Sequence, residues 1–104
     1  MALIDINNLQ QAAAAFGEAR GWGKYHSPKN LAMALSVEVA ELVEIFQWLT
    51  EEQSRTLPAD QLEHAGQEVG DIVLYLLLFC AETGLDLEQV VRAKLADCER
   101  RFLS

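Results

Sequence analysis

The longest apolar run of the sequence is IVLYLLLFCA, at residues 72–81. It is too short to span a bilayer, and in a helix its side chains would make every side apolar. A helix without a polar side is stable only when protein surrounds it. The run therefore predicts a packed arrangement in which a helix over residues 60–83 is central.

Apolar residues elsewhere in the chain also recur at helical spacing. Residues 6–20, residues 28–49 and the segment from residue 86 onward carry them three and four positions apart. Alternating runs and Asn-Gly turns, which would indicate strands, do not occur in the sequence. Four main helices joined by short loops predict an all-α four-helix bundle. The length of 104 residues predicts one domain over residues 1–104.

Signals at the expected helix ends support these boundaries. Gly21 and Gly84 follow the first and third helices, and Pro28 suits the first turn of the second. Three segments carry the capping-box pattern at the starts of a short additional turn, the third helix and the last helix: Thr50–Gln53, Asp60–Glu63 and Asp86–Gln89.

A chain with four helices has few neighbours with which to enclose the apolar segment at residues 72–79. We therefore expect a homo-oligomer, a dimer or a tetramer, whose interface uses this segment. The alternative is a central helix that the three other helices of the same chain surround. The sequence does not decide between a dimer and a tetramer.

The charge pattern narrows the possible partners. The chain has 16 acidic and 8 Lys or Arg residues, for a formal net charge of −8. Nucleic-acid binding requires a basic face, so we expect no nucleic-acid partner. We expect no membrane partner either. The first ten residues, MALIDINNLQ, lack the charged and long apolar regions of a secretory signal, which favours a cytoplasmic location.

Two acidic pairs lie on the apolar faces of the second and third helices. Glu38 and Glu41 are three residues apart, as are Glu68 and Asp71, so each pair can reach one point on its helix surface. Lys and Arg are absent from residues 30–54 and again from 56–91. Four carboxylates that converge without a basic partner would repel one another strongly in a dry setting.

A divalent cation would relieve this repulsion. Carboxylate oxygens suit hard ions, so we expect Mg²⁺, with Mn²⁺ also possible. Zinc is disfavoured because no Cys or His stands at a ligand spacing. A di-iron bundle is disfavoured because neither Glu38 nor Glu68 is followed by His three positions later.

With these pairs in view, the chain resembles the all-α nucleoside triphosphate pyrophosphatases of the MazG-like superfamily. It is most similar to the dCTP pyrophosphatase branch, over nearly its whole length. The matching motifs are Glu38-Val-Ala-Glu41, Glu68-Val-Gly-Asp71, the loop W-x-x-x-H-x-P-K-N at Trp22–Asn30, Phe46-Gln-Trp48, and Lys94 with Arg101-Phe102.

The resemblance implies a house-cleaning enzyme that hydrolyses nucleoside triphosphates, dCTP-like or modified deoxynucleotides, between the α- and β-phosphates. Mg²⁺ would be held by Glu38, Glu41, Glu68 and Asp71, and Glu41 would take the proton of the attacking water. The resemblance also implies substrate contacts for residues at matching positions, which are Trp22, His26, Lys29, Asn30, Trp48, Tyr75, Lys94 and Arg101. Lys94 and Arg101 would act across a subunit boundary.

The chain departs from the family in its last motif, K-x-x-x-N-x-x-R-Y. Cys98 replaces the asparagine and Phe102 replaces the tyrosine, so the hydrogen bonds of those two side chains are lost or replaced. The preferred base and sugar, and the number of metal ions, stay open. A non-catalytic helical module that keeps the acidic geometry and regulates a partner is the alternative function.

Overall fold

The computed structural model describes residues 5–103, and each element in that range is helical. The main helices are α1 (Ile6–Ala19), α2 (Pro28–Phe46), α4 (Ala59–Thr83) and α5 (Leu87–Leu103). A short 3₁₀ turn, η1 (Trp22–Lys24), precedes α2, and a four-residue helix, α3 (Glu51–Ser54), precedes α4. The expected all-α class and the four main helices are confirmed.

Local hydrogen bonds explain most of the helix boundaries. The Thr50 hydroxyl accepts from the backbone N–H of Gln53, and the Gln53 side chain accepts from the backbone N–H of Thr50, so this capping box is confirmed. The carboxylate of Asp86 accepts from the backbone N–H of Gln89 in the same way. Gly84 ends α4 in the left-handed region, at φ 76°.

Two boundaries differ from the sequence expectation. Asp60 does not cap α4, because the helix begins at Ala59 and Asp60 lies inside its first turn. At that position its carboxylate interacts favourably with the helix dipole. The N-cap position is Pro58, whose side chain has no acceptor. Helix α2 ends at Phe46, three residues before the expected Leu49, because the chain turns there toward α3.

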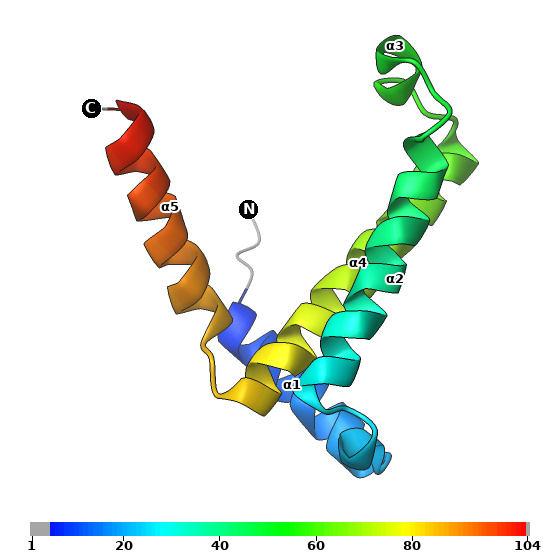
Figure 1. Ribbon diagram of the computed structural model, residues 1–104. Helices are drawn as coiled ribbons and strands as arrows, with labels where there is room; N and C mark the ends of the chain where they lie inside the picture. The colour runs from blue at the N-terminus through cyan, green and yellow to red at the C-terminus, as the bar shows by residue number, and fades with distance from the viewer. Residues whose placement is uncertain (1–4, 104) are drawn as a thin grey trace.

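The helices α2 and α4 pack side by side and antiparallel, and α1 crosses the end of this pair (Figure 1). The buried core lies at that crossing and is formed by Ala13, Leu31, Leu77 and Leu78. From the crossing, α5 extends as a separate arm that diverges from the α2/α4 pair (Figure 1). The radius of gyration is 16.2 Å, against about 13 Å for a compact domain of this length.

A closed four-helix bundle is therefore not formed within one chain. The apolar segment of α4 is only partly enclosed: Leu77 and Leu78 are buried, while Val73 and Leu74 keep 41% and 40% of their surface exposed. The exposed large apolar residues of α5 are Val90, Val91, Leu95 and Phe102. Complete enclosure of residues 72–79 by the other helices of the same chain is thus not observed. Among the described residues, no helix combines the length and hydropathy needed to cross a membrane.

Candidate functional site

Three glutamates converge between α2 and α4. Glu38 and Glu41 lie one turn apart on α2, and Glu68 approaches them from α4. One carboxylate oxygen from each residue lies within 4.8 Å of the others. The antiparallel pairing of α2 and α4 thus brings together three of the four carboxylates that the two acidic pairs were expected to place near one another. We refer to Glu38, Glu41 and Glu68 as the glutamate cluster.

The cluster is electrostatically unfavourable when no cation is bound. Glu68 is only 6% exposed, and its Oε2 atom and that of Glu38 are buried without a hydrogen-bond partner. Within residues 5–103, the ion pairs of Lys and Arg all lie on α5. The neighbouring Glu68 side chain, then partial burial, then Glu41 raise the pKa of Glu38 to about 7.

These residues fit a divalent metal ion. The donors are anionic oxygens close enough to share one ion, and two buried oxygens lack any other partner. Hard ions such as Mg²⁺ and Mn²⁺ prefer this donor set. Asp71, the fourth predicted ligand, is outside the 4.8 Å group but lines a cavity together with Glu38. Its role as a ligand stays a prediction.

The cavity next to Glu38 and Asp71 has a volume of about 420 Å³. It combines aromatic and aliphatic side chains with the two carboxylates, and aromatic faces of this kind can stack on a nucleobase. Its lining consists of Trp22, Tyr25, His26, Glu38, Asp71, Leu74, Tyr75 and Leu78. Three of the predicted substrate residues, Trp22, His26 and Tyr75, therefore lie beside the glutamate cluster.

The loop between α1 and α2 presents Trp22, Tyr25 and His26 to this cavity. Gly21, at φ 68°, turns the chain in the left-handed region that glycine adopts easily. The Trp22 ring then packs edge-on against Phe16, at 5.3 Å between centroids, and lies 5.5 Å from the His26 ring. Asn30 donates from its side-chain amide to the backbone carbonyl of Tyr25 at 3.0 Å, which ties the loop to α2.

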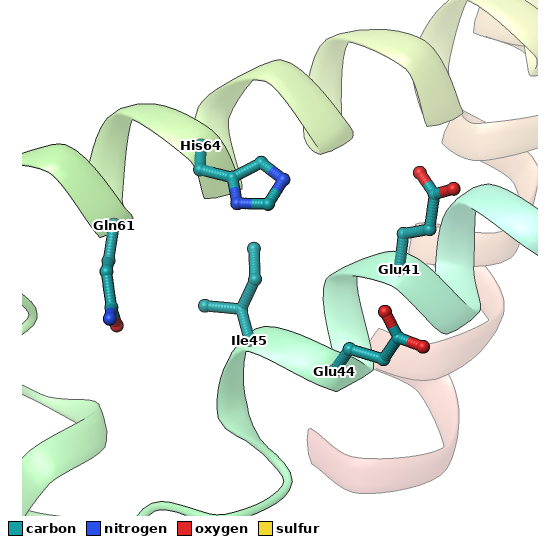
Figure 2. A pocket seen from close by; sticks show the side chains of 5 residues that line it. All are labelled: Glu41, Glu44, Ile45, Gln61 and His64. Carbon is teal, nitrogen blue, oxygen red and sulfur yellow. The ribbon is translucent and has the colours of Figure 1, made fainter.

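A second cavity, of about 540 Å³, borders the cluster at Glu41. Figure 2 shows its lining residues: Glu41, Glu44 and Ile45 project from α2, while Gln61 and His64 project from α4. Glu44 is exposed. The glutamate cluster therefore borders two cavities, an aromatic one through Glu38 and a polar one through Glu41.

The remaining predicted substrate residues do not line either cavity in the single chain. Trp48 follows α2 at the end of the pair near α3 and is 85% exposed. Lys94 and Arg101 lie on the α5 arm, where both contact Asp97, at 3.9 Å and 3.3 Å. Lys29 is exposed in the first turn of α2, and the Asn30 side chain is engaged with the loop. Their substrate roles stay predictions.

Sequence reasoning missed several residues that the structure places at the site. Tyr25, Leu74 and Leu78 line the aromatic cavity. His64 lies one helical turn before Glu68, with its Nε2 atom 3.3 Å from Glu68 Oε1. The i, i+4 spacing of His64 and Glu68 is the signal that could have identified this contact.

Comparisons with known proteins extend over most of the chain. Residues 33–102 match the MazG-like family. The chain is 34% identical over 99 residues to dCTP pyrophosphatase 1 of Bos taurus and 32% identical over 99 residues to the Homo sapiens protein of that name. These alignments include 93% of this chain, which spans only 59% and 58% of the two relatives.

A solved structure matches the fold as a whole. The crystal structure of a pyrophosphatase from Archaeoglobus fulgidus superimposes with a TM-score of 0.80 at 33% sequence identity. The match covers 100% of this chain and 97% of the archaeal one. The similarity therefore includes α5 as well as the α2/α4 pair.

Proposed function

Because this chain belongs to the MazG-like family, we propose that it is a metal-dependent nucleotide pyrophosphohydrolase. Its substrates would be nucleoside triphosphates, dCTP-like or modified deoxynucleotides, which it would cleave to a monophosphate and pyrophosphate. The observation that carries the proposal is the glutamate cluster, with its two buried, unpartnered oxygens, beside an aromatic cavity. The names of the relatives support the reaction class.

The proposed roles of the acidic residues follow from their positions. Glu38, Glu41 and Glu68, with Asp71, would hold Mg²⁺, and Mn²⁺ could replace it. A bound cation of this kind neutralises phosphate charge and lowers the pKa of water. In the reaction, a water oxygen bonds to phosphorus, the anhydride bond breaks and pyrophosphate leaves. Glu41, which lies in the cluster and opens onto the polar cavity, would accept the proton of that water.

The aromatic cavity would bind the base and sugar. The Trp22 ring already packs against Phe16 and lies close to His26, so little side-chain entropy is lost when a base stacks on it. Tyr75 supplies a hydroxyl at the same cavity. A volume of about 420 Å³ is in the usual range for a small-molecule site.

A homo-oligomer, a dimer or a tetramer, belongs to this proposal. The exposed apolar residues of α4 and α5 need a partner, and a second copy offers the same surface in return. Lys29, Asn30, Trp48, Lys94 and Arg101 would reach the substrate in that assembly. A single MazG-like domain over residues 1–104 and a cytoplasmic location stay predictions.

The decisive experiment measures pyrophosphate release from a panel of nucleoside and deoxynucleoside triphosphates. Turnover is expected with Mg²⁺, is expected to stop with a chelator, and is expected to be lost in Glu38→Gln. Absence of turnover across the whole panel, with metal binding retained, would contradict the enzyme and favour the non-catalytic regulatory module.

A further inference from the structure

His64 makes a contact that neither the acidic motifs nor the aromatic loop accounts for. It lies on α4 one turn before Glu68, and its Nε2 atom is 3.3 Å from Glu68 Oε1. The two side chains differ greatly in exposure, at 57% for His64 and 8% for Glu68. A nitrogen at the edge of the polar cavity thus reaches one oxygen of a buried carboxylate.

The two oxygens of Glu68 have different surroundings. Oε1 has the imidazole nitrogen nearby, whereas Oε2 is buried and has no hydrogen-bond partner. A carboxylate whose two oxygens were both free could rotate about its last bond. With one oxygen held, the other has a fixed direction.

We propose that His64 is a positioning residue, which holds Oε1 of Glu68 and so leaves Oε2 fixed for a divalent cation. The proposal rests on the metal-dependent function proposed above. It requires that Nε2 carries a hydrogen, which is true of the imidazolium and of one neutral tautomer, and that this N–H is directed at Oε1 across the 3.3 Å contact. Groups that orient metal-binding carboxylates in this way typically change metal affinity about 10- to 100-fold.

His64 is not itself one of the clustered ligands. Histidine nitrogens can also bind metal ions. Within the described residues, however, the side chains whose ligand atoms all lie within 4.8 Å of one another are Glu38, Glu41 and Glu68, without His64. Figure 2 shows the His64 ring in the space between α4 and α2, above Ile45. A role through Glu68 therefore fits the geometry better than direct coordination.

Titration of the protein with Mn²⁺ alone, without nucleotide, tests this role. We expect His64→Ala to weaken Mn²⁺ binding about 10-fold or more. His64→Gln is expected to retain most of the affinity, because its side-chain amide can donate over a similar reach. Gln61→Ala is the matched control, since Gln61 lines the same cavity from the same helix, and we expect it to bind Mn²⁺ as the wild type does.

Thermal melting and kinetics separate positioning from a structural role. A structural i, i+4 pair would lower the melting temperature of His64→Ala without changing the Mn²⁺ dissociation constant. Positioning predicts that His64→Ala needs more Mg²⁺ for half-maximal activity and that kcat recovers at saturating Mg²⁺.

Each outcome has a defined meaning. Wild-type Mn²⁺ affinity in His64→Ala would overturn the role of His64 while leaving the metal centre intact. Absence of Mn²⁺ binding in the wild type would overturn the metal centre, and His64 with it. If His64→Ala does not fold, the comparison of His64→Gln with the shorter His64→Asn decides, and equal affinities in these two variants would overturn the proposal.

Discussion

The α2/α4 pair gathers carboxylates between its two helices, whereas the α5 arm carries four Lys and Arg residues. Between α2 and α4, three glutamates meet beside an aromatic cavity, and one of them is buried. On α5, Lys94, Arg100 and Arg101 contact Asp97, and Figure 1 shows α5 diverging from the α2/α4 pair. Within one chain, three acidic side chains are thus brought together, and the basic side chains of α5 are not brought to them.

The two regions also differ in how their apolar residues are covered. Leu31 of α2 and Leu77 of α4 are 1% and 5% exposed, whereas Leu95 of α5 is 58% exposed. Exposure of this kind is costly in water, at roughly 25 cal/mol for each Å² of apolar surface left uncovered. The comparison teaches that metal binding should be a property of the single chain, while efficient turnover should depend on what covers α5.

The largest expected effect comes from removing a carboxylate of the glutamate cluster. Glu68→Gln should lower kcat/KM about 100- to 1,000-fold, because a buried ligand is lost. The same change should raise the melting temperature of the metal-free protein, because one of three converging carboxylates, with a buried oxygen that has no hydrogen-bond partner, is removed. Steady-state pyrophosphate release and thermal melting in a chelator measure the two effects.

Glu44→Gln is the control for this prediction, since Glu44 lines the neighbouring cavity but is outside the cluster. It should leave both quantities nearly unchanged. Equal losses in Glu44→Gln and Glu68→Gln would show that general negative charge matters and that the cluster geometry does not.

The next largest effect should come from the α5 arm. Leu95→Asp places a charge in its exposed apolar surface, and light scattering should then give a mass near the 11.6 kDa of one chain. We expect kcat/KM to fall about 100-fold, as is typical when binding groups are misplaced, while Mn²⁺ affinity stays unchanged. Glu99→Gln, an exposed change on the same helix, serves as the control.

A monomeric Leu95→Asp variant with full activity would contradict the dependence of turnover on what covers α5, because the single chain would then suffice for activity. Loss of Mn²⁺ binding in the same variant would contradict the expectation that the single chain binds metal, because the metal centre would then also depend on the assembly.

The local features of this structure were predictable from the sequence because neighbouring residues determine them. The capping box at Thr50, the left-handed Gly84 and the meeting of Glu38 and Glu41 with Glu68 follow from turn chemistry and helical spacing. The position of α5 was not predictable. Periodicity identifies an apolar face but not which surface covers it, so the sequence did not predict that Leu95 of α5 would be exposed in the single chain.

The contact of His64 was missed for a different reason. A histidine three residues after a glutamate is the pattern of di-iron bundles, and a search for it does not detect a histidine four residues before one. The spacing alone predicts that the two side chains share a face. Only the burial of Glu68 indicates that the contact has a consequence beyond the surface.

A smaller effect is expected for the base-binding cavity. Trp22→Ala should raise KM about 10-fold, since stacking of one base contributes about 1–3 kcal/mol. Trp48→Ala should raise KM in the assembled wild type, where a second copy can deliver this exposed side chain. In the Leu95→Asp background, Trp48→Ala should have no further effect. A KM increase in both backgrounds would place Trp48 at the cavity of its own chain.

The smallest effect concerns the pH dependence of folding without metal. The pKa of Glu38 is about 7 in the folded protein and 4.5 in its unperturbed state, so between these values the folded protein keeps a proton that the unfolded chain releases. The contribution of Glu38 to stability is therefore fully present at low pH and is lost as the pH rises through about 7. The groups that face Glu38 are Glu41 and Glu68, the latter in contact with His64, and His26, Asp71 and Tyr75 at the cavity.

The melting temperature of Glu38→Gln in a chelator, relative to that of the wild type, should accordingly increase between about pH 5 and about pH 8. The difference between the two proteins removes the contribution of all other titrating groups. Adding Mg²⁺ at the higher pH should stabilise the wild type more than Glu38→Gln. The cation reduces the repulsion between the carboxylates, which the proton on Glu38 reduces at low pH. A difference that does not change with pH would mean that the neighbouring glutamates do not raise the pKa of Glu38, and the convergence between α2 and α4 would then be looser than the structure indicates.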